Sequence, residues 1–219
     1  MWRRFFSWFV KITGWLPWTI ACRTKVYYQN KRVQSRKIKG KAIIISNHRS
    51  VYDFAMMLFL FPCRALRCMI AEVMFRKNPL FSFFLKSLGG IEVDRESHDF
   101  SFVQKGYDIL QKNGVVEIYP ESRLPEKGEQ TPLPFKPSTA YMALLSQAPV
   151  IPVFTNGCYF KKKRNKVLIG TPVNVWEWYD ETLSEKQNFE NITNGLRDTV
   201  IELQNEFERR ENTKENEKA

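Results

Sequence analysis

Cysteine and histidine are scarce in this sequence of 219 residues, which contains four cysteines and two histidines. The cysteines form neither a C-x-x-C pair nor the spacing of zinc ligands; they are Cys22, Cys63, Cys68 and Cys158. This pattern is typical of reduced thiols in a cytosolic compartment, and it gives no reason to expect a metal or any other cofactor. A Gly-x-Ser-x-Gly turn, the usual setting of an esterase nucleophile, is also missing.

Acidic residues are absent from positions 1–52, although the same positions hold twelve of the 34 lysines and arginines. From position 53 onward, 22 basic residues nearly balance 23 acidic ones, so the net charge of +11 is concentrated near the N-terminus. A basic segment of this kind suits either nucleic acid or an anionic membrane. The residues that lie between the basic ones decide between these two partners.

Aromatic residues crowd the first 22 positions, which contain four of the six tryptophans. On a helix, one apolar stripe follows the 3.6-residue period and consists of Trp2, Phe5, Phe6, Phe9, Ile12 and Leu16. A polar stripe beside it consists of Arg3, Arg4, Ser7 and Lys11. This arrangement predicts a helix in the interface of an anionic membrane, with the basic stretch 23–41 adding electrostatic attraction. Nucleic acid is not expected as a partner, because a phosphate-binding arm has no need of so many aromatic rings.

Two other interpretations of the N-terminal segment stay open. A full membrane span would bury Lys11 at mid-length, at a cost of about 2.5–3.5 kcal/mol on insertion scales, and Pro17 interrupts the run. The other is a helix packed on the rest of the protein, followed by a solvated linker. A second basic cluster at 161–164 is either a solvated turn between strands or a further contact with membrane phosphates.

Strand-like and helix-like segments alternate along the rest of the chain. Short apolar runs predict strands at 42–46, 66–71, 91–94, 115–119, 150–154 and 166–173. Helices are predicted at 52–61, 79–88, 100–112, 138–146 and 183–210. The alternation favours an α/β fold with a largely parallel central sheet covered by helices. We therefore divide the chain into a membrane-associating segment (1–41), one α/β domain (42–210) and a charged tail (211–219).

His48 follows directly after the predicted strand 42–46, and Asp53 lies five residues further on. Reactive groups collect at the carboxyl ends of strands in α/β folds. If Ser50 caps the next helix, Asp53 occupies its third position, and the carboxylate can turn back toward His48. The pair then has the form of a general base with an orienting carboxylate. The alternative is a plain loop histidine beside a helix-capping aspartate. The second histidine, His98, lies in a polar stretch and is expected at the surface.

Four short motifs follow one another between residues 43 and 154. The first is Asn-His, four residues and Asp, here Asn47, His48 and Asp53; the second is a glycine, an apolar strand and an arginine, here 89–95. The third is Tyr-Pro-Glu-Ser-Arg at 119–123, and the fourth is Val-Ile-Pro-Val at 150–153, with Pro-Phe-Lys at 134–136 between them. In order and spacing these motifs resemble those of the lysophosphatidic acid acyltransferase family of glycerolipid acyltransferases.

The resemblance implies a glycerolipid-acyltransferase-like fold and transfer of a fatty acyl group from an acyl thioester to the free hydroxyl of a lysophospholipid. The expected acceptor is 1-acyl-sn-glycerol-3-phosphate, which gives phosphatidic acid, and the expected donor is acyl-ACP or acyl-CoA. The protein is expected to be peripheral or monotopic on the cytoplasmic face of a membrane. His48 is the expected base, and Asp53 is its partner. The residues expected to bind substrate are Arg95, Glu121, Ser122, Arg123 and Lys136. Arginine suits this role because its planar fork holds a phosphate in bidentate fashion.

Two departures from the family pattern bear on the acceptor. The third motif is one residue shorter than the common Phe-Pro-Glu-Gly-Thr-Arg form and has Ser122 where glycine is usual. Glu72 and Val73 stand where relatives often carry lysines. A different lysolipid acceptor therefore stays open. A lipid hydrolase that uses Ser46 or Ser50 with His48 is a second alternative, and a non-catalytic membrane-binding protein is a third.

Overall fold

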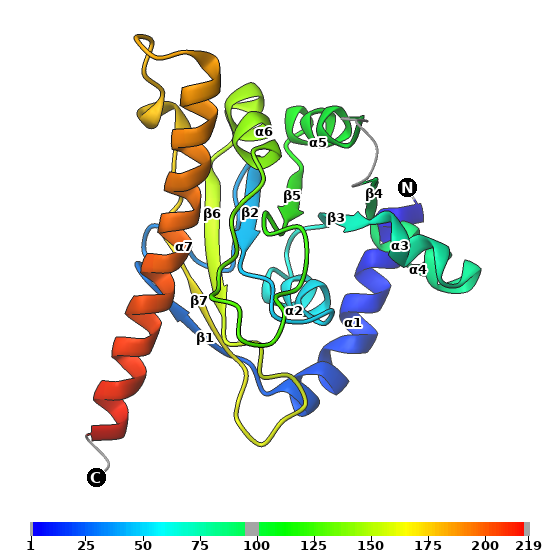
Figure 1. Ribbon diagram of the computed structural model, residues 1–219. Coiled ribbons are helices and arrows are strands. Elements are labelled where there is room, and N and C mark those ends of the chain that lie inside the picture. Colours follow the sequence, from blue (N-terminus) through cyan, green and yellow to red (C-terminus); the bar gives the residue numbers. More distant parts are fainter. Residues whose placement is uncertain (1, 95–100, 217–219) are drawn as a thin grey trace.

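A seven-stranded sheet forms the centre of the protein in the computed structural model, which describes residues 2–94 and 101–216 (Figure 1). The strand order is β1-β7-β6-β2-β5-β3-β4. The strands are β1 (Lys25–Tyr28), β2 (Ala42–Ser46), β3 (Leu66–Ala71), β4 (Ile91–Val93), β5 (Val115–Ile118), β6 (Val150–Thr155) and β7 (Lys166–Ile169). Two residues discussed above, Arg95 and His98, lie outside the described residues.

Neighbouring strands run parallel throughout this sheet except for β6 and β7, which are antiparallel. The predicted α/β fold with a largely parallel sheet is therefore confirmed. The exception follows from the short connection 156–165 between β6 and β7. A parallel pair needs a longer crossover, whereas an antiparallel pair can be joined by a turn.

The edge strand β1 was not predicted. Its sequence, Lys-Val-Tyr-Tyr, lies within the segment 1–41 that we assigned to membrane association, and it pairs with β7. The sheet thus begins before the predicted domain boundary at residue 42. A four-residue strand at a sheet edge, exposed or half-buried along its length, has no continuous apolar run to signal it.

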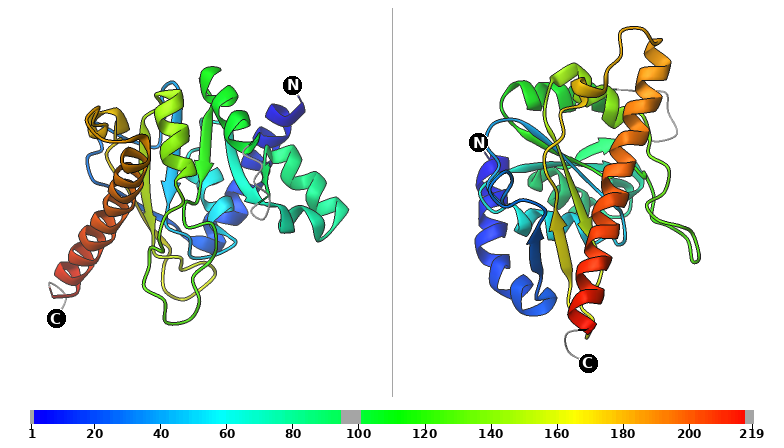
Figure 2. Two further views of the ribbon diagram at one scale, coloured as in Figure 1. Left: turned by 45° about the horizontal axis from the view of Figure 1, so that its top comes forward. Right: turned by 90° about the vertical axis from the view of Figure 1, so that its left-hand side faces the viewer.

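Helices cover both faces of the sheet (Figure 2). One face carries α5 (Ser101–Gln111), α6 (Ser138–Ser146) and α7 (Glu185–Asn216), and the other carries α1 (Trp2–Cys22) and α2 (Asp53–Leu60). Strand β2 contributes to the hydrophobic cores on both faces. Ile43 and Ile45 belong to the core beneath α5, α6 and α7, whereas Ala42 and Ile44 belong to the core beneath α1 and α2. Because both faces are buried, the strand is apolar throughout instead of alternating.

Several element ends differ from the prediction. Helix α7 continues to Asn216, so most of the predicted charged tail is helical. Strand β7 ends at Ile169, and Val173 forms only an isolated bridge with Val150. Two short elements were not predicted: α3 (Glu72–Arg76) and the 3-10 helix η1 (Val175–Trp178). Helix α4 (Pro79–Leu88) has its predicted bounds, because the Asn78 side chain caps its start and Gly89 ends it with φ of 95°.

Two members of the polar stripe of α1, Ser7 and Lys11, face the domain, contrary to what a simple membrane-lying helix suggests. Ser7 and Lys11 are buried, and the Lys11 ammonium donates to the carbonyls of Phe61 at 3.0 Å and Pro62 at 3.3 Å. It also donates to the carbonyl of Arg64. These carbonyls follow the C-terminal end of α2, where the helix dipole favours a cation. Burial lowers the pKa of Lys11 to about 8.

The apolar side chains of α1 are consequently left at the surface. Ile12 is 73% exposed, and the other exposed members are Phe5, Trp8, Phe9, Trp15, Leu16 and Ile20. None of the helices within residues 2–94 and 101–216 combines the length and the apolar character that crossing a membrane requires. Helix α1 is fixed to the domain by two aromatic contacts: Trp18 stacks on Phe59 of α2, and Phe6 meets Phe84 of α4 edge-on.

Candidate active site

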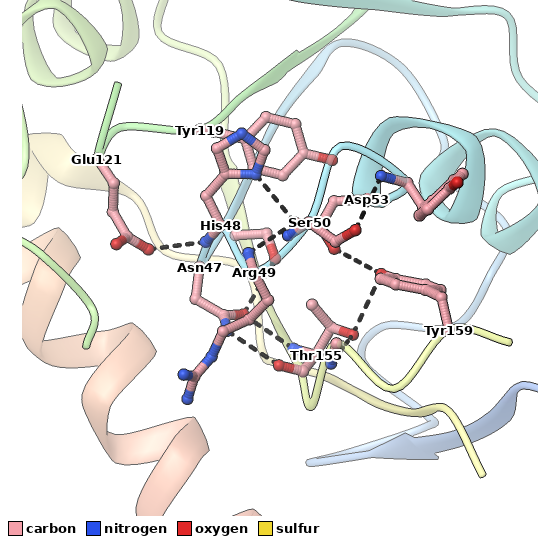
Figure 3. A network of polar contacts seen from close by, with 12 residues as sticks. Asn47, His48, Arg49, Ser50, Asp53, Tyr119, Glu121, Thr155 and Tyr159 are labelled. Carbon is pink, nitrogen blue, oxygen red and sulfur yellow. Dashed lines mark hydrogen bonds and ion pairs between the residues drawn. The ribbon is translucent and has the colours of Figure 1, made fainter. Parts of the chain in front are cut away.

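The candidate active site lies at the carboxyl edge of the sheet, where β2, β5 and β6 end (Figure 3). The three strands are parallel and adjacent, so the segments that follow them meet at this edge. His48 follows β2, Glu121 follows β5, and Thr155 ends β6. The edge therefore gathers residues that are far apart in the sequence.

His48 and Asp53 are in direct contact. The Nδ1 atom of His48 lies 2.9 Å from Oδ2 of Asp53. The same oxygen accepts the backbone N–H groups of Arg49 at 2.7 Å and Ser50 at 2.9 Å. A carboxylate with three donors on one oxygen is held in place and accepts only, so we infer that Nδ1 carries the imidazole proton. The Nε2 atom then keeps its lone pair and can act as a base.

The two side chains differ in access to solvent. The side chain of His48 is 21% exposed, whereas that of Asp53 is 0% exposed. A substrate can therefore reach the imidazole but not the carboxylate. This difference in exposure is the one expected of an accessible base and a buried carboxylate that orients it.

The loop around Asp53 is built differently from the prediction. Helix α2 begins at Asp53 itself, with Tyr52 as its N-cap residue, and no side chain caps its start. Ser50 instead accepts the N–H of Tyr52 with its hydroxyl and that of Asp53 with its carbonyl. Asp53 turns back over the loop as predicted, but from the first helical position instead of the third.

Tyr159 completes the surroundings of Asp53, and sequence reasoning missed it. Its hydroxyl donates to Oδ1 of Asp53 at 2.6 Å, so both carboxylate oxygens are engaged. Burial, together with the charge of Asp53, raises the pKa of Tyr159 well above its usual range, and the phenol stays a donor. Tyr159 lies in the connection after β6, 106 positions from Asp53, and no local pattern marks it.

Tyr119 packs against the imidazole ring of His48. Its ring stacks on the imidazole of His48 with centroids 4.5 Å apart. Its hydroxyl donates to Oε1 of Glu117 at 2.5 Å. Glu117 is fully buried in β5, and burial raises its pKa to about 8, so the carboxyl is largely protonated at neutral pH. Neither Tyr119 nor Glu117 was predicted to have a role beside His48.

Two buried side chains tie the loops together. The Asn47 amide exchanges two hydrogen bonds with the backbone of Thr155, both 2.9 Å long, and so joins the ends of β2 and β6. Glu121 accepts the N–H of His48 at 2.7 Å with one oxygen and that of Leu133 at 2.8 Å with the other. Glu121 was predicted to bind substrate, and the structure shows both of its oxygens engaged by backbone.

Ser122 adopts a left-handed backbone conformation, with φ of 61°. Glycine reaches this region without strain, whereas an L-residue is disfavoured there by about 1–2 kcal/mol. This conformation gives a physical reason for the glycine that is usual at this place in the family's third motif. The Ser122 hydroxyl donates to the backbone carbonyl of Pro120 at 3.4 Å.

Two of the predicted phosphate ligands, Arg123 and Lys136, lie at the surface. Arg123 is exposed and forms a bidentate ion pair with Glu129 on its own loop, with distances of 2.7 and 2.6 Å. This contact raises the pKa of Arg123 and lowers that of Glu129 to about 2. Lys136 is exposed, and its backbone N–H donates to the carbonyl of Pro120. Arg95, as noted, lies outside the described residues.

The two serines of the hydrolase alternative have other partners. The hydroxyl of Ser46 donates to the amide oxygen of Asn47 at 3.3 Å, and Ser46 is buried. The hydroxyl of Ser50 accepts from the backbone of Tyr52 at 3.2 Å. A serine nucleophile needs a hydrogen bond to its base. In these positions the serines support the loop instead.

Together, the fold and site define an α/β protein in which a partly exposed histidine, paired with a buried aspartate, lies at the carboxyl edge of the sheet. The family model described as Acyltransferase matches residues 23–156, and the chain belongs to the acyltransferase family. The matched segment begins just before β1 and ends just after β6. It therefore contains the His48–Asp53 pair and the loop that holds Glu121.

Known proteins similar to this chain are 1-acyl-sn-glycerol-3-phosphate acyltransferases. The human beta form is 29% identical over 150 residues, which are 66% of this chain and 51% of that protein. The Cocos nucifera enzyme is 22% identical over 156 residues, covering 66% and 49%. This chain thus spans about half the length of the curated relatives it matches.

A solved structure shares the fold. The crystal structure of PlsC, the 1-acyl-sn-glycerophosphate (LPA) acyltransferase of Thermotoga maritima, superimposes with a TM-score of 0.64. The likeness covers 92% of this chain and 81% of that one, at 19% sequence identity. The shared fold extends beyond residues 23–156, because it covers nearly the whole of this chain.

Proposed function

We propose that this protein transfers a fatty acyl group from an acyl thioester to the free hydroxyl of 1-acyl-sn-glycerol-3-phosphate, forming phosphatidic acid. The observation that carries the proposal is the 2.9 Å contact between His48 Nδ1 and Asp53 Oδ2 at the carboxyl edge of the sheet. Family membership supports the acyl-transfer chemistry. The names of the similar proteins support this acceptor.

The reaction follows from the geometry of His48. Its Nε2 atom takes the proton of the acceptor hydroxyl as the oxygen attacks the thioester carbonyl. The carbon–sulfur bond breaks, a new ester forms, and the imidazolium returns its proton to the departing thiolate. Asp53 stabilises the imidazolium between these two steps, because its charge and its bond to Nδ1 favour the protonated ring.

The phosphate of the acceptor needs basic partners near His48. By resemblance these are Arg95, Arg123 and Lys136. In the structure Arg123 pairs with Glu129, and this pair lies at the surface. An incoming phosphate carries more charge than one carboxylate, so it can take over the guanidinium and free Glu129. We therefore expect the loop 123–129 to rearrange when the acceptor binds.

The donor is acyl-ACP or acyl-CoA. Both present the same thioester to the site, and the proposed chemistry is the same with either. The carrier protein is acidic and suits a basic surface, whereas coenzyme A carries its own phosphates. The assay below distinguishes these donors.

The exposed face of α1 supports attachment to a membrane. Its apolar side chains point outward while Lys11 is buried, so the face offers apolar contact to lipid. Positions 1–52 have no acidic residue, which favours an anionic surface on the cytoplasmic side. We propose that α1 lies in the interface and that the protein is peripheral or monotopic there.

Two neighbours of α1 extend this face. Helix α4 packs against α1 and exposes Leu80 and Phe83. At the other end, Phe160 is exposed beside Trp18 and precedes the basic turn 161–164. This turn is joined to the end of α1, since Arg164 donates to the carbonyl of Arg23 at 2.5 Å. Exposed apolar side chains on α1 and α4 and a basic turn thus lie on segments that contact one another, a combination that membrane interfaces favour.

The experiment is a product analysis with the purified full-length protein in mixed micelles. Lysophosphatidic acid and other lysolipids are each combined with acyl-ACP and with acyl-CoA, and products are identified by mass spectrometry. Phosphatidic acid formed only when both substrates are present supports the proposal. A preference for another lysolipid, or free fatty acid formed without an acceptor, contradicts it and favours the alternative acceptor or the hydrolase.

A further inference from the structure

We infer that Tyr159 is a positioning residue of this enzyme, which fixes the second oxygen of Asp53 and thereby sets how strongly the aspartate favours the imidazolium of His48. The inference rests on the proposed function, because it assigns Tyr159 a part in the same reaction. It goes beyond the His48–Asp53 pair by adding a third side chain in line: hydroxyl, carboxylate, imidazole (Figure 3).

The contact is short and charge-assisted. The Tyr159 hydroxyl lies 2.6 Å from Oδ1 of Asp53, while Oδ2 faces His48. Hydrogen bonds to an ionised acceptor are stronger than neutral ones. Asp53 is fully buried, so its charge depends on such donors and not on water. Without the hydroxyl, one carboxylate oxygen loses its donor inside the protein.

The ring of Tyr159 is held on several sides. Trp18 of α1 lies 6.2 Å away and Tyr52 lies 6.1 Å away, centroid to centroid. Thr155 lies 3.4 Å from the hydroxyl. Tyr159 is 5% exposed, so it cannot meet the substrate and acts through Asp53. The helix that carries the proposed docking face therefore also packs the residue that orients the catalytic carboxylate.

The expected effect of removing the hydroxyl has a definite sign. A hydrogen bond to Oδ1 draws negative charge away from the oxygen that faces His48. When this bond is absent, the carboxylate attracts the protonated imidazole more strongly. The base must be neutral to accept a proton, so the acid limb of the pH–rate profile moves to higher pH.

Other ionisable groups also face this cluster. Glu121 contacts the backbone of His48, Tyr119 covers its ring, and Glu117 lies behind Tyr119. Arg49 lies near Glu121, and Cys22 of α1 lies near Tyr159. A change from tyrosine to phenylalanine leaves all of them in place. Their effects therefore cancel when the variant is compared with the wild type.

The test compares Tyr159→Phe with the wild type in the full-length protein. Transfer kinetics give kcat, both KM values and the pH profile. Because the chain has two histidines, an NMR titration resolves the His48 signal, and His98→Gln assigns it. Tyr28→Phe is the matched control, since it removes one phenol hydroxyl from the distant edge strand β1. We expect kcat to fall about tenfold with little change in either KM.

We also expect the acid limb and the His48 NMR titration to move to higher pH in Tyr159→Phe and not in Tyr28→Phe. Wild-type kinetics and titration in Tyr159→Phe overturn the inference. A loss of activity that comes with a lower unfolding temperature and an unmoved titration also overturns it, because the role is then merely structural. If the wild type transfers no acyl group, the proposed function fails, while the NMR titration still decides the role of Tyr159.

Discussion

At the scale of single residues, the site contains several side chains that are fixed and one, Arg123, that can exchange its partner. His48, Asp53 and Glu121 are each held by buried or backbone partners. Arg123 instead forms an exposed pair with Glu129. Exposed pairs are weak and screened by salt, so this arginine is available to a stronger anion.

We predict that Arg123→Ala raises the acceptor KM about tenfold or more and leaves the donor KM nearly unchanged. Arg123→Lys should restore it only in part, because lysine lacks the bidentate fork. Glu129→Gln is the control: it removes the competing carboxylate, so the acceptor KM should stay the same or fall. Initial rates at varied acceptor and donor concentrations give these values. If Arg123→Ala keeps the wild-type acceptor KM, the phosphate is held elsewhere.

At the scale of elements, one face of α1 packs on the domain and the opposite face is exposed. Lys11 and Trp18 fix the helix to α2, whereas Ile12 and Leu16 lie exposed on its outer side. Deleting the helix would therefore disturb the domain as well as any membrane contact. Substitutions on the outer side alone separate the two effects.

We predict that Ile12→Glu together with Leu16→Glu greatly reduces binding of the protein to anionic vesicles without changing its thermal unfolding. The change puts two carboxylates on a face that we propose meets lipid. Leu145→Glu is the matched control, since Leu145 is an exposed leucine on α6, across the sheet from α1. Co-sedimentation at low and high salt measures binding.

High salt should release the wild-type protein only in part, because it screens charges but not apolar contacts. Equal sedimentation of the double variant and the wild type argues against the docking face. Complete release of the wild type by salt points to a purely electrostatic arm.

The elements differ in how far they could be predicted from the sequence. Strands such as β2 and β6 are continuously apolar, so their positions and the parallel sheet follow from composition. The 3.6-residue period of α1 shows two stripes but not which stripe meets the domain. That choice depends on the carbonyls at the end of α2, which only the folded chain brings to Lys11.

The same limit applies to the site. His48 and Asp53 lie five positions apart, and their contact could be predicted from the motif and a helix start. Tyr159 reaches Asp53 across 106 positions, and no periodicity predicts such a contact. The stacking of Tyr119 on His48 likewise depends on the pairing of β2 with β5. Local patterns thus find the His48–Asp53 pair and miss the side chains that hold it in place.

At the scale of the whole molecule, the buried carboxyl of Glu117 links folding to pH. Burial raises its pKa from 4.5 to about 8 in the folded state. Between these values the folded protein binds more protons than the unfolded chain. The stability that Glu117 contributes is therefore fully present below pH 4.5 and is lost as the pH rises toward 8.

We predict that Glu117→Gln becomes more stable relative to the wild type as the pH rises from 5 to 8. The slope of this difference approaches at most about 1.4 kcal/mol per pH unit. Glutamine keeps an acceptor for the Tyr119 hydroxyl but cannot ionise. Denaturant unfolding at the two pH values gives the free energy of unfolding of each protein. A difference that is the same at both pH values contradicts a protonated Glu117.

The central claim, general-base acyl transfer by His48, is tested most directly by the rate at which His48→Ala forms phosphatidic acid. The rate is measured by mass spectrometry beside the wild type and His98→Ala, which removes the second histidine. We predict that His48→Ala is slower by about 10²–10⁴-fold, with normal unfolding, while His98→Ala transfers at the wild-type rate. A folded His48→Ala protein that forms phosphatidic acid at the wild-type rate would contradict the claim.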